Sequence, residues 1–296
     1  MVPGYRAHED LARRERNGLS TDMTSSNAPN TRLLPERAIL SINGSDARAL
    51  LQRVITADVE TLERGQCRPG ALLTPQGKTM VDFLIFADGD QVLIDVHSDA
   101  ADALAKRLKM YKLRADATME RRADLHAVWS GQPDDLAVDP RLRGRAWRGI
   151  SDEAPQPDTG QLSALEIAHG IPAFGRDYGE GDIFPTDVNL DVYGGIGWNK
   201  GCFIGQEVVS RMKRRGTIRK RSVAVSFEGD APDVGTALKA GAVSVGALTS
   251  VNGSNAVALI RVDKLEKVGG DVTAGDQPAQ IDVPDNLKPD EAATKV

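Results

Sequence analysis

A chain of 296 residues, 41% hydrophobic and 27% charged, is long enough for a sizeable core and for more than one domain. Its net charge of −5 argues against bulk attraction to nucleic acid, and no apolar run reaches the length that crosses a membrane. We therefore expect no direct nucleic-acid partner and no membrane partner, and we expect a monomer.

The two cysteines, Cys67 and Cys202, lie far apart and have no C-x-x-C spacing. This pattern argues against a disulfide framework and against a zinc or iron–sulfur ligand set supplied by this chain alone. The four histidines show no metal-ligand spacing, so no metal site is expected. No secretory signal pattern is recognisable, which predicts a reducing, cytoplasmic location.

The first elements follow a polar start. Residues 1–30 lack apolar periodicity, so we expect them to be disordered. Order is predicted to begin with a strand over 37–42. The Asn43-Gly44 turn then leads into a helix over 46–54, with Ser45 as its N-cap.

Three strands and a longer helix come next. Segments 70–74, 80–87 and 91–97 are predicted strands, and the last two form a hairpin through Asp88-Gly89-Asp90. A helix is predicted over 99–113, because its apolar residues recur at helical spacing.

The middle of the chain has weaker signals. Residues 124–130 predict another strand, and the segment 131–160, rich in Pro, Asp and Arg, predicts loops around a weak strand at 147–150. A short helix is predicted over 162–169, ended by Gly170.

The pattern changes after residue 220. Short β-type segments at 221–228, 242–251 and 255–262 are separated by glycine-rich turns, which is typical of a small β-barrel. The predicted parts are a disordered extension, an α+β body, a C-terminal β-barrel and a loose tail, over residues 1–30, 31–220, 221–283 and 284–296.

The most informative stretch is Lys200-Gly201-Cys202-Phe203-Ile204-Gly205-Gln206-Glu207-Val208-Val209-Ser210-Arg211. Gly205 suits a helix entry, and Glu207 and Arg211 are spaced as a helical ion pair. Cys202 lies just ahead of this helix, and an extended segment would point Lys200 the same way, so both features favour a thiolate. The alternatives are an anion held by the helix N–H groups, or a buried cysteine in a tightly packed turn.

This stretch resembles the Lys-Gly-Cys-[Tyr/Phe]-x-Gly-Gln-Glu-x-x-x-Arg fingerprint of the YgfZ-type folate-binding proteins, which are relatives of the glycine-cleavage T protein. The mitochondrial iron–sulfur assembly factor of the same family carries a similar motif. The resemblance covers roughly residues 31–265. It includes Gly170-Ile171-Pro172, the segment 182–191, Arg214-Arg215-Gly216 and Arg219-Lys220-Arg221.

The resemblance implies a T-protein-like body of antiparallel sheets with helices, and tetrahydrofolate or a one-carbon derivative as ligand. It also implies support for the assembly or repair of iron–sulfur enzymes, with those enzymes or assembly proteins as partners and an indirect effect on tRNA modification. Lys200 and Cys202 are the first catalytic and folate-binding candidates. Three roles stay open for the thiol: nucleophile, redox-sensitive thiol and transient cluster ligand. Further folate-binding candidates are Trp198, Gln206, Glu207 and Arg211.

Asp82 lies within an apolar predicted strand. By alternation its carboxylate is either exposed on a solvent face or held in a cleft. The segment resembles the Gly-Gly-x-x-Asp-Asp-Leu stretch of the T protein, whose aspartate faces the folate; Asp82 matches the second acid and Val81 replaces the first. Asp82 is thus also a catalytic and folate-binding candidate, in a cleft expected to be shared with the Lys200–Arg211 segment.

A second departure lies at Leu165-Glu166-Ile167-Ala168-His169-Gly170, where the T protein has Leu-Arg-Leu-Glu-Ala-Gly. Aligned on Gly170, the glutamate that reads the pterin falls on Ala168. Both departures argue against the T-protein reaction. A folate-dependent aminomethyltransferase and a pure interaction module remain the alternatives. The basic cluster that follows the fingerprint is a solvated face or an anion-binding rim: Arg211, Lys213, Arg214, Arg215, Arg219, Lys220 and Arg221.

Overall fold

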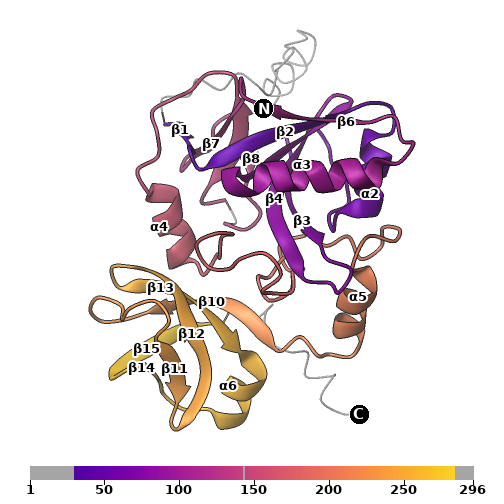
Figure 1. Ribbon diagram of the computed structural model, residues 1–296. Helices are drawn as coiled ribbons and strands as arrows, with labels where there is room; N and C mark the ends of the chain where they lie inside the picture. Colours follow the sequence, from indigo (N-terminus) through magenta and orange to yellow (C-terminus); the bar gives the residue numbers. More distant parts are fainter. Residues whose placement is uncertain (1–29, 143, 284–296) are drawn as a thin grey trace, which may run out of the picture.

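The computed structural model describes residues 30–142 and 144–283, which form two packed sheets followed by a closed barrel (Figure 1). The predicted α+β body with a C-terminal β-barrel is confirmed. Residues 1–29 of the predicted extension and all of the predicted tail lie outside the described residues.

A five-stranded antiparallel sheet forms the centre of the body. Its strand order is β3-β4-β5-β2-β6, with bounds Cys67–Leu73, Thr79–Asp88, Gln91–His97, Arg37–Asn43 and Thr118–Arg122. The predicted hairpin is confirmed as β4–β5, where Asp88 pairs with Gln91 across the turn. Strand β6 is missing from the sequence-based expectations, because only Met119 in Thr118-Met-Glu-Arg-Arg is buried and the strand lies at the sheet edge.

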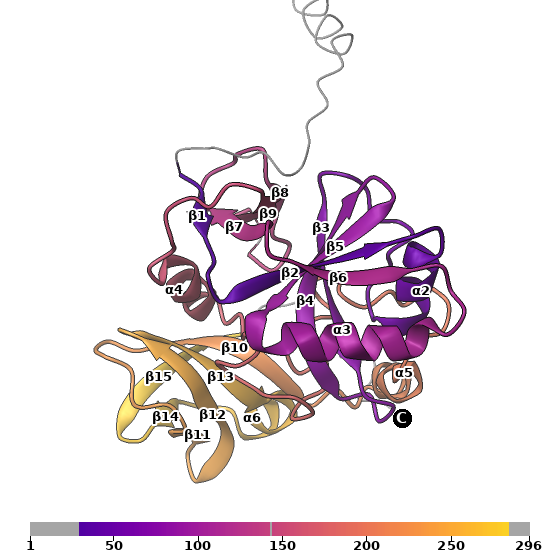
Figure 2. The same ribbon diagram turned by 45° about the horizontal axis from the view of Figure 1, so that its top comes forward.

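Two helices cover one face of this sheet, α2 (Ala47–Val54) and α3 (Ser98–Lys112). Figure 2 shows α3 lying across the strands. Their apolar stripes are fully buried, with Leu50, Leu104 and Leu108 in one cluster with Phe83 of β4. Burial of such a helical face supplies most of the stability of short helices.

The predicted N-cap of α2 is wrong. Asp46, not Ser45, occupies the N-cap position, and its side chain makes no capping bond within the helix. Both side chains instead bind the loop before β6: the Asp116 N–H donates to Asp46 Oδ2 at 2.8 Å, and Ser45 Oγ donates to Asp116 Oδ2 at 3.0 Å. A tertiary contact has therefore replaced the local capping bond.

The other face of the five-stranded sheet packs on a four-stranded sheet. Leu84, Phe86 and Leu93 share a core there with Trp129 and Ile150. The strand order is β1-β7-β9-β8, with bounds Arg32–Leu33, His126–Ser130, Trp147–Ser151 and Ala137–Val138. The weak strand predicted at 147–150 is confirmed as β9. Strands β4 and β5 are thus buried on both faces, so a charged residue within them faces a core or a cavity and not solvent.

The C-terminal barrel closes where β10 pairs with β15, and it lies beneath the body in Figure 1. Its order is β10-β13-β12-β11-β14-β15, with bounds Lys220–Ser226, Asn255–Arg261, Val243–Asn252, Ala237–Ala240, Val272–Ala274 and Gln277–Asp282. Helix α6 (Val262–Val268) follows β13. Strands β11, β14 and β15 and helix α6 had not been expected, because their segments are short, at three to seven residues each.

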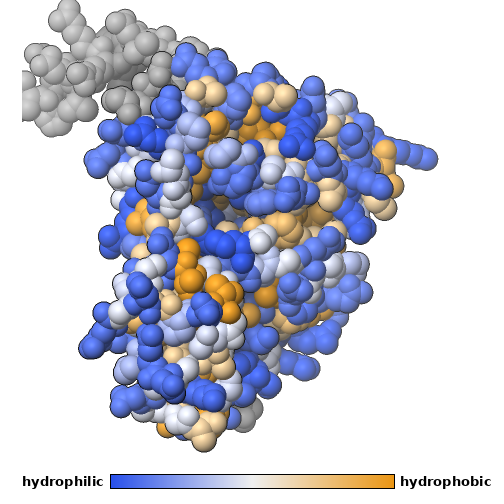
Figure 3. Space-filling view, turned by 60° about the vertical axis from the view of Figure 1, so that its left-hand side comes forward, coloured by the Kyte–Doolittle hydropathy of each residue, from blue (hydrophilic) through white to orange (hydrophobic). Residues whose placement is uncertain are grey.

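Helix α4 (Gln161–Ala168) joins the body to the barrel. Gly170, at φ 68°, ends it, and a Cβ at this position would lie 2.2 Å from the Ala224 nitrogen of β10. Only glycine allows this close approach of two backbones. The Ser222 hydroxyl donates to the Gly170 carbonyl at 3.0 Å and fixes the junction. On the side seen in Figure 3 the surface is mainly hydrophilic, with hydrophobic residues gathered near the junction of body and barrel.

Candidate functional site

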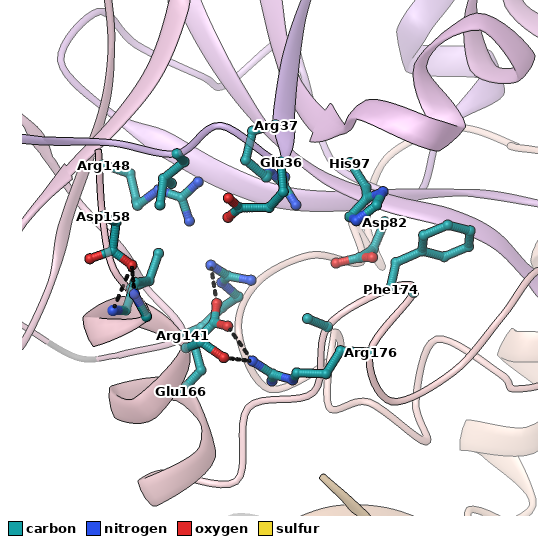
Figure 4. A pocket seen from close by; sticks show the side chains of 16 residues that line it. Glu36, Arg37, Asp82, His97, Arg141, Arg148, Asp158, Glu166, Phe174 and Arg176 are labelled. Carbon is teal, nitrogen blue, oxygen red and sulfur yellow. Dashed lines mark hydrogen bonds and ion pairs between the residues drawn. The ribbon is translucent and has the colours of Figure 1, made fainter. Parts of the chain in front are cut away.

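A cavity of about 330 Å³ lies between the two sheets and α4. Figure 4 shows Asp82, His97 and Phe174 at one end, Glu36, Arg37 and Arg148 along one wall, and Glu166 and Arg176 opposite. The lining is strongly charged, and its charged residues include Arg37, Asp82, Arg141, Arg148, Glu166 and Arg176. We call this space the Asp82 cavity.

Asp95 of β5 anchors one wall of the Asp82 cavity. Its carboxylate is fully buried and accepts hydrogen bonds from Arg37 Nε at 2.6 Å and from Arg148 Nη2. Burial opposes ionisation of Asp95, but the guanidinium groups of Arg37 and Arg148 outweigh it and hold the pKa of this carboxyl below its usual value. A buried, fully paired carboxylate of this kind fixes both arginines in place.

The charge chain continues through Asp139 to α4. Arg141 binds Asp139 through two nitrogens, at 3.0 and 2.7 Å, and its Nη2 lies 3.5 Å from Glu166 Oε1. Burial disfavours the charge on Arg141, but Asp139 outweighs it and raises the pKa of the guanidinium well above its usual value. The dashed lines in Figure 4 follow Glu166 on to Arg176, at 3.1 Å.

The same chain reaches the barrel. Arg176 Nε donates to Asp177 Oδ2 at 2.8 Å, and Asp177 Oδ1 accepts from the hydroxyls of Thr249 and Ser250 on β12, at 2.7 and 2.6 Å. One continuous set of ion pairs and hydrogen bonds therefore connects the cavity wall to the barrel. The shape of the cavity therefore depends on how the two sheets and the barrel pack against one another.

Two buried polar atoms of cavity-lining residues have no hydrogen-bond partner among the described residues: Asp158 Oδ1 and Arg148 Nε. The other Asp158 oxygen accepts from the backbone N–H groups of Gly160 and Leu162 at the start of α4. Unpaired buried acceptors and donors are costly, so these atoms call for a ligand or ordered water. Asp82 is half-buried and faces the cavity, which decides between its two predicted settings in favour of the cleft.

Tyr178 is a buried neighbour of Asp82. Burial, then the charge of Asp82 and a side-chain hydrogen bond with it, raise the pKa of the Tyr178 phenol well above its usual value. The tyrosine ring packs edge-on against Phe174, with ring centroids 6.0 Å apart. Tyr178 therefore stays neutral near the Asp82 carboxylate.

Lys200 of the fingerprint is a structural residue in this geometry. It is 9% exposed, and its Nζ donates to the carbonyl oxygens of Ile55 and Ala57 at 2.7 and 2.6 Å, just after α2. Burial, partly offset by Asp58, lowers its pKa to about 8. The ammonium therefore binds two backbone carbonyls. Lys200 was predicted to point the same way as the Cys202 thiol, but its hydrogen bonds are made to the segment after α2.

Gly205 docks the fingerprint on the β3–β4 turn. Helix α5 (Gln206–Arg214) begins after it, and Gly205 has φ 77°. A Cβ here would lie 2.6 Å from the Thr74 carbonyl oxygen and 3.0 Å from Gly77. Gln206 stabilises the turn that leads into α5, since its Oε1 accepts from the Phe203 N–H at 3.2 Å. These residues hold the fingerprint in place by close packing.

Cys202 is exposed and lies outside the Asp82 cavity. The predicted ion pair of Glu207 and Arg211 forms at 2.8 Å, also on the exposed surface. Trp198 is half-buried, and its ring lies under Lys213 Nζ at 4.0 Å. None of the fingerprint candidates lines the cavity that contains Asp82, so the structure does not bring the two groups of predicted site residues together.

Arg221 does not belong to the exposed basic cluster that the sequence predicted. It is buried and forms a two-nitrogen ion pair with Asp191, at 2.6 and 3.0 Å, at the start of the barrel. The remaining members are exposed on or just after α5: Arg211, Lys213, Arg214, Arg215, Arg219 and Lys220.

Sequence reasoning missed most of the cavity. Arg141 and Arg148 lie in the segment taken as loops around a weak strand, and the buried partner of Arg148 is distant, since Asp95 is 53 residues away. One signal was available, because Asp95 interrupts the apolar strand Val-Leu-Ile-Asp-Val just as Asp82 interrupts its own. Glu166 is the acid that reaches the cavity, although the alignment had left the pterin-reading position to Ala168.

Within residues 30–142 and 144–283, no cluster of three or more His, Cys, Asp or Glu side chains could hold a metal ion. No helix in this part of the chain is long and apolar enough to cross a membrane.

The fold is similar to the crystal structure of the glycine cleavage system aminomethyltransferase T from Bartonella henselae. The TM-score is 0.69, over 87% of this chain and 85% of that chain. At 14% sequence identity, the similarity establishes the shared fold alone.

The mouse protein named iron-sulfur cluster assembly factor IBA57, mitochondrial (Mus musculus), is 30% identical over 265 residues, which span 76% of this chain and 72% of the mouse protein. The homologous factor of Neurospora crassa is 31% identical over 241 residues, or 68% of this chain. That match spans 55% of the fungal protein, so the chain covers about half of its length.

These relatives correct the expected cytoplasmic location, because both are named as mitochondrial proteins. The expectation rested on cysteine usage and on the lack of a secretory pattern. Neither feature separates one reducing compartment from another.

The barrel matches a family of its own, described as "CAF17, C-terminal beta-barrel domain", over residues 219–289. The match begins one residue before β10. Together with the 72% coverage of the mouse protein at 30% identity, it shows that the chain belongs to the IBA57/CAF17 family, on a T-protein-like fold.

Proposed function

We propose that this protein binds tetrahydrofolate or a one-carbon derivative in the Asp82 cavity and supports the assembly or repair of iron–sulfur proteins. The observation that carries the folate part is the Asp82 carboxylate, which lines a charged cavity within a T-protein-like fold. The assembly role rests on the names of the IBA57 relatives.

The cavity residues fit a reduced pterin. Its ring carries several N–H donors and one carbonyl acceptor, and the cavity lining includes the Asp82 carboxylate as an acceptor and the Arg148 guanidinium as a donor. Phe174 adds an aromatic wall beside Asp82. In this proposal Asp82, Arg148 and Phe174 hold the ligand, which would supply a one-carbon unit or act as an allosteric ligand.

The same geometry weighs against aminomethyl transfer. Both Glu166 oxygens are engaged by Arg141 and Arg176, so this acid is not free to read a pterin edge. Val81, at the position of the other T-protein acid, is buried in the core beneath α2 and α3. Asp82 is the one carboxylate of this stretch that faces the cavity, and we propose a binding role for it.

The exposed Cys202 thiol is the fingerprint group that a partner can reach. We place the contact with iron–sulfur enzymes or assembly proteins at this surface, with the cluster as cargo of the partner. An effect on tRNA modification would then be indirect, through enzymes that need a cluster.

Calorimetric titration of the full chain with tetrahydrofolate tests the folate part. We expect Asp82→Asn to weaken binding by about tenfold or more, because the charged acceptor is lost. Glu207→Gln is the matched control: this acid was also a folate candidate, but it is exposed on α5, and its loss should leave affinity unchanged. Absence of binding by the wild type would favour the interaction-module alternative, whereas turnover of an aminomethyl donor would favour the transferase.

A further inference from the structure

A second cavity adjoins the Asp82 cavity. It has a volume of about 210 Å³ and lies beside the start of α3. Phe174 is the residue of the described chain that lines both spaces. Its half-buried ring lies between His97 and Tyr178, with centroids 6.0 Å from each. Phe174 thus lies where the two cavities meet.

Three segments contribute residues to both cavities. Along β4, Asp82 lines the first and Met80 the second; at the junction of β5 and α3, His97 lines the first and Asp99 the second. The loop that carries Phe174 also continues into the second cavity. The two cavities are therefore neighbours along β4, at the β5–α3 junction and along this loop.

The two cavities differ in chemistry. The second is mainly apolar, lined by Leu72 and Met80 and by one face of α3 at positions Ala100, Ala103, Leu104 and Arg107, which share a helical stripe. Asp99 and Glu180 lie at its edge, and Arg107 is the one cation among its described lining residues. Arg107 is exposed and makes no ion pair within the described part of the chain.

We propose that the two cavities form one elongated site, in which the second takes the aromatic arm of the ligand whose polar head lies beside Asp82. This inference rests on the proposed folate function and specifies how the ligand is divided. A volume of 330 Å³ is at the small end of ligand pockets, which span roughly 300–1,000 Å³. A reduced folate carries an aminobenzoyl ring and a glutamate beyond its pterin. The apolar cavity suits that ring, Phe174 packs against the link, and Arg107 faces the terminal carboxylate.

Ala103→Trp tests the second cavity without touching the first. Ala103 is exposed on α3, so an indole there fills the apolar space and leaves the core intact. The matched control is Lys109→Trp, which adds the same side chain at an exposed position of α3 that does not line the cavity. Thermal melting of both variants establishes that each is folded.

Each protein is titrated with tetrahydrofolate and with 6-methyltetrahydropterin, which has the head but no arm. We expect Ala103→Trp to weaken tetrahydrofolate binding by about tenfold, because the arm loses its apolar burial, and to leave the pterin affinity unchanged. Lys109→Trp should change neither. Arg107→Gln should weaken tetrahydrofolate binding about threefold and leave the pterin unaffected.

The outcomes distinguish failure of the two-part site from failure of the proposed folate binding. Equal tetrahydrofolate affinity in wild type and Ala103→Trp overturns the two-part site and leaves the folate function standing. Equal weakening of both ligands also overturns it, since the second cavity would then act on the head. If the wild type binds neither ligand, the folate function fails and this inference fails with it.

Discussion

The Asp82 cavity and the Lys200–Arg211 fingerprint differ in how sequence relates to space. The cavity gathers charged side chains from both sheets, α4 and a loop, and one of its buried ion pairs joins residues 53 positions apart. The fingerprint is contiguous, yet its members separate into a buried lysine, a packed glycine and an exposed thiol. Neighbouring residues of one sequence motif can therefore have separate structural roles, whereas a ligand site can be built from residues that form no recognisable motif in the sequence.

If the charged residues around the cavity form a buried network, removing one of their charges should lower the free energy of unfolding more than any other substitution considered below. Asp95→Asn removes the buried carboxylate shared by Arg37 and Arg148 and leaves Arg148 with its longer contact to Asp139, at 3.8 Å, so we expect the free energy of unfolding to fall by about 3–5 kcal/mol. Urea denaturation measures the change. Asp124→Asn is the control, because it removes the exposed ion pair with Arg122 and should not move the midpoint. Equal midpoints for the two variants would contradict a structural network around the cavity.

Lys200→Met should be the next largest effect. The Ile55 and Ala57 carbonyls lose their buried donor, which we expect to cost about 2–3 kcal/mol near pH 7 in denaturant titrations. Lys213→Met, at an exposed lysine over Trp198, should cost little. A fingerprint lysine devoted to chemistry would instead leave stability unchanged on substitution.

The pH dependence of the same variant sharpens this test. The folded pKa of Lys200, about 8, lies below the ordinary lysine value of 10.5, so between these pH values the unfolded chain binds more protons. Stability contributed by Lys200 therefore rises with pH across this window and is lost as pH falls through 8. The stability difference between wild type and Lys200→Met should grow between pH 8 and pH 10.5, and a difference that shrinks would contradict the burial of the ammonium.

Gly205→Ala examines the packed part of the fingerprint. Its φ of 77° and the contact with Thr74 disfavour any Cβ, so we expect a loss of about 1–3 kcal/mol. Gly201→Ala, four residues earlier, is a matched control, since a Cβ there meets no atom within 4 Å. Thermal or urea unfolding distinguishes the two, and similar stabilities would mean that the β3–β4 turn can move away from α5.

Local signals explain which parts of the fold were predictable. The β4–β5 hairpin and α3 have strong periodicity and a clear turn, so their positions follow from neighbouring residues. Strand β6 has one buried side chain and depends on pairing with β2. Its tertiary environment, and not its own sequence, determines that it is a strand.

The candidate site was predictable only where a single residue contradicted its surroundings. Asp82 stood out because a carboxylate in an apolar strand needs a reason. Arg141 and Arg176 lie in polar segments, where arginine is ordinary, and their roles appear only when folding brings Glu166 between them. Fingerprint residues were easy to notice but hard to assign, since packing and chemistry both restrict sequence.

Cys202→Ser should have the smallest effect on stability and isolates the chemical part of the fingerprint. The thiol is exposed, so the free energy of unfolding should change by less than about 0.5 kcal/mol. Alkylation of the native protein should be lost with it, because burial shields Cys67 and raises the pKa of that thiol. In cells that lack the gene, the serine variant should fold and bind tetrahydrofolate but fail to restore iron–sulfur enzyme activity, with Cys67→Ser retaining the thiol at position 202 as control. Full restoration by Cys202→Ser would leave the thiol without a chemical role, and the fingerprint would then act through packing alone.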